Sequence, residues 1–131
     1  MRWIFVYNAD SGSLNTVFDI AHKIISPDTY ECNLCMLTYG TFSEQKVWKR
    51  FRQESIWDFE FLHKDEFEKK YRSHFEYPVI VQQIGDDFEV VLARDEIDVI
   101  DEVEDLIEIL NAKAAESELQ PVPIRKDSKP L

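Results

Sequence analysis

The pattern of hydrophobic and polar positions divides the chain into alternating strands and helices. An unbroken apolar and aromatic row over residues 2–8 predicts a buried strand, and apolar residues alternating with acidic ones predict another over 57–62. Two short apolar runs on either side of Gly85 predict a β-hairpin over 79–92. Helices are predicted where apolar residues recur at spacings of three and four, over residues 13–25, 43–53, 65–71 and 101–113. The alternation of these elements predicts an α/β domain.

Length and composition agree with one folded domain. The chain has 131 residues, of which 44% are hydrophobic and 13% aromatic, as in globular proteins with a buried core. We expect this domain to cover residues 1–113. Residues 114–131 become rich in charge and proline, which predicts a disordered tail.

The charge of the chain is strongly acidic and unevenly distributed. A net charge of −11 opposes binding to a nucleic acid backbone. Residues 64–113 carry 15 acidic side chains against 6 basic ones. Such an excess is typical of a solvated helix face, and an acidic docking surface for a basic protein partner is the alternative.

The start of the chain and its hydrophobic runs predict a cytoplasmic protein. The first apolar run ends at Asn8 and Asp10, which is too short for a signal peptide. No run approaches the roughly 18 apolar residues that a membrane-spanning helix needs. We therefore expect no membrane association.

The only two cysteines, Cys32 and Cys35, are three residues apart. This spacing permits a small disulfide loop, half of a metal site, or simple packing of two apolar side chains. In a reducing compartment, a redox-active pair is more plausible than a permanent structural disulfide. On the redox interpretation, Cys32 is the exposed nucleophile and Cys35 the buried resolving thiol, although the neighbouring Glu31 disfavours a thiolate.

The metal interpretation needs further ligands. A structural zinc site takes four cysteine or histidine ligands, so His22 and His63, or His74, would have to complete the single C-x-x-C pair. Their spacing matches no standard zinc motif, and we assign no metal ligand. Nucleotide chemistry is also unsupported, because the chain has only 3 glycines and no G-x-x-x-x-G-K-[ST] sequence.

The order of elements, with the proline of Tyr77-Pro78-Val79-Ile80 preceding the hairpin, is similar to the thioredoxin-like fold. The resemblance covers residues 2–113 and implies a central mixed sheet of about four strands, flanked by helices, with a cis-proline at position 78. Thioredoxins carry their C-x-x-C directly after the first strand, where this chain has Asn8 to Ser13 and no sulfur. In a simple thioredoxin arrangement, the cysteines would therefore lie at the opposite end of the sheet from Pro78.

A second resemblance rests on the block Cys32-x-Leu34-Cys35-x-Leu37-Thr38-Tyr39-Gly40. This block looks like a family of small bacterial proteins without an established function, so it implies no activity. The leading hypothesis is a cytoplasmic thiol–disulfide redox protein that uses Cys32 and Cys35 without a cofactor and acts on a thiol substrate or protein partner. The alternative is a non-catalytic protein-binding module with a Cys/His zinc site or an acidic docking helix.

Overall fold

Four strands form one mixed sheet at the centre of the protein. The computed structural model describes residues 2–11, 20–26, 31–39 and 44–119. The strands are β1 (Arg2–Tyr7), β2 (Asp58–His63), β3 (Val79–Ile84) and β4 (Asp87–Leu92). They lie in the order β2-β1-β3-β4; β1 and β2 are parallel, whereas β3 runs antiparallel to both of its neighbours. The α/β class and the four-stranded mixed sheet expected from the sequence are confirmed.

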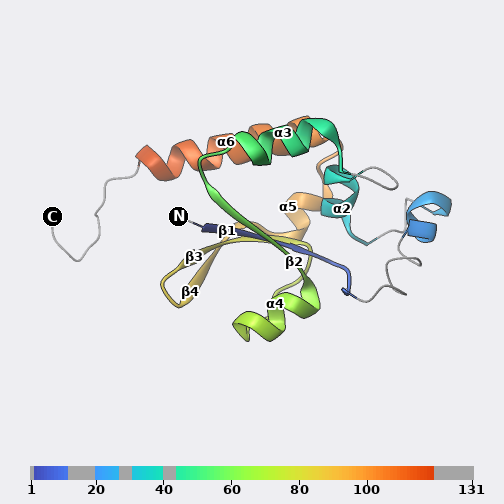
Figure 1. The fold of residues 1–131 in the computed structure, drawn as a ribbon, viewed down its shortest axis with the longest axis horizontal. Helices are drawn as coiled ribbons and strands as arrows, with labels where there is room; N and C mark the ends of the chain where they lie inside the picture. Colours follow the sequence, from blue (N-terminus) through green and yellow to red (C-terminus); the bar gives the residue numbers. More distant parts are fainter. Residues whose placement is uncertain (1, 12–19, 27–30, 40–43, 120–131) are drawn as a thin grey trace, which may run out of the picture.

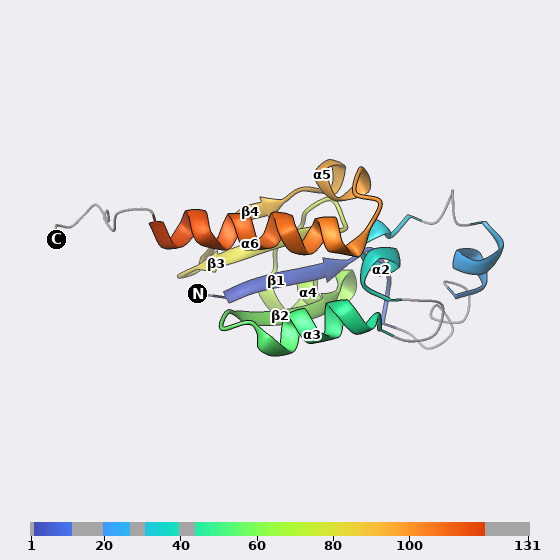
Figure 2. The ribbon, with the colours of Figure 1, turned by 90° about the horizontal axis from the view of Figure 1, so that it is seen from above.

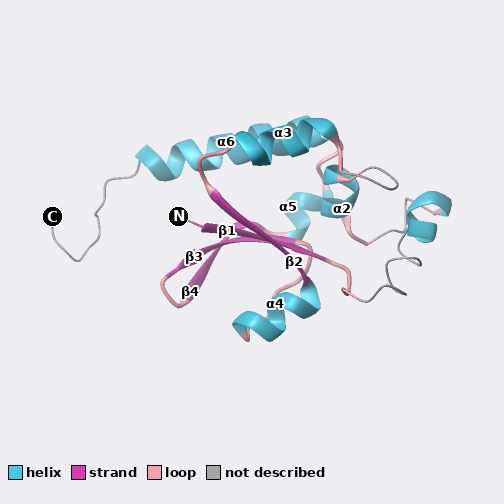
Figure 3. Ribbon diagram, in the orientation of Figure 1, coloured by secondary structure: helices cyan, strands magenta, loops and turns pink. Residues whose placement is uncertain are grey.

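Helices cover both faces of this sheet. One face carries α2 (Asn33–Thr38), α3 (Lys46–Glu54), α5 (Arg94–Asp98) and α6 (Val103–Leu119), and the other carries α4 (Lys64–Tyr71) (Figure 1). Figure 2 shows α3 and α6 next to each other over the sheet, and the two helices are in contact. Figure 3 shows the resulting three layers, with the strands between the helices.

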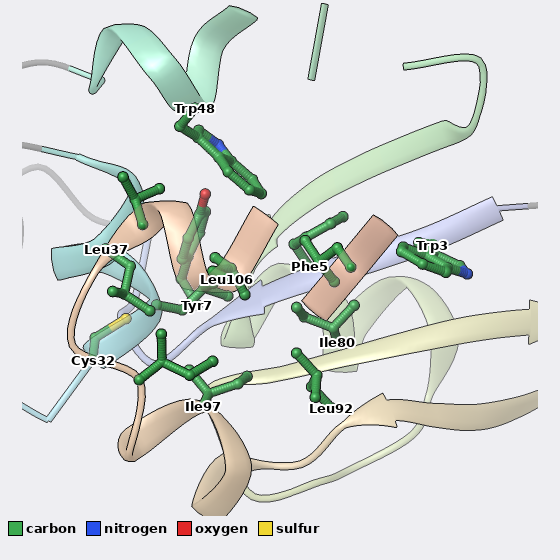
Figure 4. Packing of buried hydrophobic residues seen from close by; sticks show 14 of the residues in the cluster. Trp3, Phe5, Tyr7, Cys32, Leu37, Trp48, Ile80, Leu92, Ile97 and Leu106 are labelled. Atoms are coloured by element: carbon green, nitrogen blue, oxygen red, sulfur yellow. The ribbon is translucent and has the colours of Figure 1, made fainter. Parts of the chain in front are cut away.

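The central strand β1 is buried on both sides, which explains its unbroken apolar sequence. Because successive side chains point to opposite faces, Trp3, Phe5 and Tyr7 enter the larger core. The alternate residues Ile4 and Val6 enter the smaller core under α4. Figure 4 shows the larger core along β1, with Trp3 at one end and Cys32 at the other.

Aromatic rings fill much of both cores. In the larger core, Phe5 meets Trp48 of α3 with ring centroids 5.6 Å apart. In the smaller core, Phe67 and Tyr71 of α4 lie 5.4 Å apart, on the common helix face that their spacing predicts. Trp3 and Trp48 are 1% and 0% exposed and belong to the larger core.

The helices differ from the sequence prediction at their ends. Of the predicted helix over 13–25, residues 20–25 are helical, and the earlier part lies outside the described residues. The short helix α5 was not predicted. Helix α6 ends at Leu119 rather than at residue 113, and Ala114 joins the larger core with 8% exposure. Residues 114–119 continue the helix because they consist mainly of alanine, glutamate and leucine, which are strong helix formers.

Candidate functional site

The two cysteines form a disulfide bond at the end of β1. Cys32 is the residue before α2, and Cys35 lies in the first turn of that helix, with their Cα atoms 5.2 Å apart. This separation is within the ordinary range for disulfides. The backbone N–H of Asn8, the residue directly after β1, donates a hydrogen bond to Sγ of Cys32 at 3.3 Å. This contact places the disulfide at the carboxyl end of the parallel β1–β2 pair.

The two cysteine residues differ in their exposure to solvent. Cys32 is 1% exposed and belongs to the larger core, whereas Cys35 is half-buried and packs against that core. The expectation of an exposed Cys32 and a buried Cys35 is therefore wrong. Leu34 and Leu37 lie on the face of α2 that turns toward the sheet, and Cys35 is rotated away from that face by its position on the helix.

The sulfur of Cys32 accepts hydrogen bonds from two backbone N–H groups. One belongs to Asn8, as described above, and the other belongs to Cys35 at 3.3 Å. Hydrogen bonds to the charged form of a group stabilise that form. The geometry therefore suits Cys32 to hold a thiolate after reduction.

The residues between the cysteines anchor the loop to the rest of the protein. The side-chain amide of Asn33 donates to the backbone carbonyl groups of Ile97 at 2.7 Å and Ile100 at 2.9 Å. Leu34 is fully buried, and its carbonyl accepts a 2.8 Å hydrogen bond from the hydroxyl of Thr38. The disulfide loop is thus tied to the α5–α6 corner and to the core.

Lys23 contacts the C-terminal end of α2, the helix that carries Cys35. Its ammonium group donates to the carbonyl of Cys35 at 3.3 Å and to that of Tyr39 at 2.8 Å, at the C-terminal end of α2. Burial lowers the pKa of Lys23. Burial raises the pKa of Tyr7, whose ring lies 6.2 Å from that of Tyr39, and burial also raises the pKa of Tyr39. Both phenols therefore stay neutral beside the disulfide at neutral pH.

Pro78 lies at the same end of the sheet as the cysteines. Val6 of β1 pairs with Val79 of β3, so Pro78 stands next to the end of β1, where Asn8 contacts Cys32. The peptide bond between Tyr77 and Pro78 is cis. The expectation that cysteines and proline lie at opposite ends is wrong. That expectation assumed that the helix after β1 carries the chain to the far end of the sheet. The chain instead returns to the end of β1, where the side chain of Asn8 donates a hydrogen bond to the carbonyl of Glu31.

His63 and His74 bond to glutamates and not to the cysteines. His63 bonds to Glu66 in the first turn of α4, and His74 bonds to Glu68 of the same helix. Helix α4 lies on the other face of the sheet from α2 (Figure 1). Within the described parts of the chain, no group of three or more histidine, cysteine, aspartate or glutamate side chains is placed to hold a metal ion. A disulfide sulfur is also not the thiolate that zinc requires.

The acidic helix α6 uses its apolar side for the core and leaves its acidic side exposed. Val103, Leu106 and Leu110 are buried, whereas Glu104 and Glu108 face solvent. This is the amphipathic arrangement of a solvated surface helix. Among the helices described, none combines the length and apolar character needed to cross a bilayer.

Sequence reasoning identified the cysteines but missed four polar residues of the site, namely Asn8, Lys23, Asn33 and Lys64. Lys64 donates a 3.1 Å hydrogen bond to the side-chain oxygen of Asn8. Asn8 in turn contacts the sulfur of Cys32, so one residue separates Lys64 from that sulfur. Only the placement of Asn8 after a buried strand signalled a site residue. Comparison with family models, with curated proteins and with solved structures finds no match to this chain.

Proposed function

We propose that the protein carries out thiol–disulfide exchange through Cys32 and Cys35. The observation that supports this proposal best is the pair of backbone N–H donors on the buried sulfur of Cys32, next to a half-buried Cys35. A buried sulfur with donors in place is suited to leave as a thiolate, and an accessible sulfur is suited to be attacked. The roles are therefore the reverse of those expected from the sequence.

In the first step, a substrate thiolate attacks Sγ of Cys35. A bond forms between the substrate sulfur and Cys35, and the bond between Cys35 and Cys32 breaks. Cys32 leaves with the bonding electron pair as a thiolate, and the N–H groups of Asn8 and Cys35 donate to it. A leaving thiolate that is stabilised in this way departs faster.

In the second step, another substrate thiolate attacks the substrate sulfur of the mixed disulfide. The substrate disulfide forms, and Cys35 leaves as a thiolate that takes up a proton from solvent. Two electrons have moved from the two substrate thiols to the protein, which now holds both cysteines reduced. The same steps in reverse reduce a substrate disulfide, with Cys35 as the attacking thiolate.

Two features of the fold also favour this function. The disulfide lies at the carboxyl end of parallel strands, where α/β proteins commonly place their sites. Pro78, the proline on which the resemblance to the thioredoxin-like fold rests, directly precedes β3 and lies at the end of the sheet that holds the disulfide. The substrate class and the cytoplasmic location expected from the sequence stay predictions.

The test is to equilibrate the protein with mixtures of reduced and oxidised glutathione, trap free thiols by alkylation and weigh the intact protein. If the proposal holds, the protein should interconvert fully between a disulfide form and a dithiol form at reduction potentials between about −120 and −300 mV. A Cys35→Ser variant should form no mixed disulfide with glutathione, because its remaining sulfur is buried. A Cys32→Ser variant should form one readily. A disulfide that cannot be reduced without denaturant, or equal reactivity of the two variants, would contradict the proposal.

A further inference from the structure

The backbone N–H that contacts Cys32 belongs to a segment held by α4 from the other side of the sheet. The amide of Lys64 donates to the carbonyl of Ala9 at 3.2 Å. Asp65 accepts two hydrogen bonds from Ser11, one from its backbone N–H at 3.1 Å and one from its hydroxyl at 2.6 Å. The first turn of α4 therefore fixes the chain after β1, from which Asn8 reaches the disulfide.

Asn8 links three parts of the protein through three polar groups. Its backbone N–H donates to Sγ of Cys32 at 3.3 Å, and its side-chain N–H donates to the carbonyl of Glu31 at 3.0 Å. Its side-chain oxygen accepts a 3.1 Å hydrogen bond from the ammonium group of Lys64. The two side-chain bonds hold the residue in the orientation in which its backbone N–H points at the sulfur.

The charges around this sulfur differ in sign. Glu31 precedes Cys32 in the chain and is exposed, and its carboxylate disfavours a thiolate at Cys32. Lys64 is half-buried, and its positive charge favours a thiolate at Cys32 through the hydrogen bond to Asn8. Lys23 donates a hydrogen bond to the carbonyl of Cys35. In a chain with a net charge of −11, these two lysines are cations held next to the disulfide loop by hydrogen bonds.

We propose that Asn8 and Lys64 are positioning residues that stabilise the reduced form of the Cys32–Cys35 pair. The inference rests on the proposed exchange function and names the residues that favour reduction of the disulfide. On reduction by a dithiol such as dithiothreitol, the reagent becomes a cyclic disulfide and the protein gains two electrons. The negative charge that forms on Cys32 is met by the N–H of Asn8, which the ammonium group of Lys64 holds in place.

The test measures the equilibrium between the wild-type protein and dithiothreitol and repeats the measurement in four variants. Lys64→Met removes the charge and keeps the length, and Asn8→Ala keeps the backbone N–H but removes both side-chain anchors. In both variants, the equilibrium constant for reduction should fall about threefold to tenfold, because the charge acts through one intervening residue. Lys64→Arg keeps the positive charge, so its equilibrium constant for reduction should stay close to that of the wild type. Lys69→Met is the matched control, since Lys69 is an exposed lysine of the same helix.

A second measurement separates this role from a merely structural one. With ¹³C-labelled cysteine, the Cβ signals of the reduced protein report the pH at which each sulfur loses its proton. Cys32 should ionise at a higher pH in Lys64→Met and Asn8→Ala than in the wild type and in Lys69→Met. Melting temperatures establish that each variant is folded.

The outcomes distinguish this inference from the proposed function. If the wild-type disulfide is reversibly reduced but folded Lys64→Met and Asn8→Ala keep its equilibrium constant and its Cys32 ionisation, the positioning role is wrong while exchange stands. An equal effect of Lys69→Met would also overturn the inference, because it would show a general effect of net charge. If the wild-type disulfide itself does not exchange, the proposed function fails first.

Discussion

Replacing one cysteine at a time by alanine tests the unequal burial of the two sulfurs. Both Cys32→Ala and Cys35→Ala remove the same cross-link, which closes a loop with a sequence separation of 3. The chain-entropy model gives this loop a contribution of about 2 kcal/mol to the free energy of unfolding. Because this contribution is common to both variants, the difference between them reports only the surroundings of each sulfur.

The structure predicts that Cys32→Ala is the less stable variant. Cys32 is 1% exposed, and its loss leaves the N–H groups of Asn8 and Cys35 without their acceptor. In Cys35→Ala, the sulfur of Cys32 and both donors remain, and only a half-buried sulfur is lost. Half-buried donors without an acceptor and a small core void cost about 1–3 kcal/mol, which is the expected difference in unfolding free energy.

Urea denaturation followed by tryptophan fluorescence measures this difference. With a slope of about 1–3 kcal/mol per molar urea, the two midpoints should lie on the order of 1 M apart. The reduced wild-type protein is the reference, and it should unfold close to Cys35→Ala because both keep the buried Cys32 thiol. Equal midpoints, or a lower midpoint for Cys35→Ala, would refute the assignment of Cys32 as the buried sulfur.

Three further variants test other parts of the fold. Asn33→Ala loses two hydrogen bonds to the α5–α6 corner and should lower the free energy of unfolding by about 1–3 kcal/mol in urea titrations, whereas the exposed Asn111→Ala should leave it unchanged. Phe67→Ala should lower it by about 3–5 kcal/mol without altering the glutathione equilibrium, because this ring lies in the smaller core; a changed equilibrium would show coupling between the two faces. Burial alone would raise the pKa of Glu60, but hydrogen bonds from Lys70 and Tyr71 and the charge of Arg2 bring that pKa below its ordinary value of 4.5. The resulting stability is present above pH 4.5 and is lost as the pH falls through the lowered pKa, so acid unfolding curves of Glu60→Gln should depend less on pH in that range.

Elements with a strong local pattern were predicted well. The strand over residues 2–8 is β1, and the alternating segment over 57–62 is β2 shifted by one residue. The hairpin over 79–92 is β3 and β4. These predictions succeeded because the periodicity of a strand or helix records which side chains face a core, whatever the partner elements are.

The polar contacts of the site could not be predicted from a local sequence pattern. The hydrogen bond from Asn8 to Cys32 joins residues 24 positions apart, the one from Lys64 to Asn8 joins residues 56 apart, and the one from Asn33 to Ile97 joins residues 64 apart. An asparagine after a strand and a lysine at the start of a helix are common on any surface. Nothing in their own neighbourhood distinguishes them from solvated side chains.

The sequence by itself determined the α/β class, most of the element order and the capacity of Cys32 and Cys35 to form a small disulfide. Those properties follow from hydrophobic periodicity and from a spacing of three residues, both of which are local. Only the tertiary structure decided which sulfur is buried and at which end of the sheet the pair lies. These depend on how the chain returns to the end of β1, and contacts between distant segments govern that path.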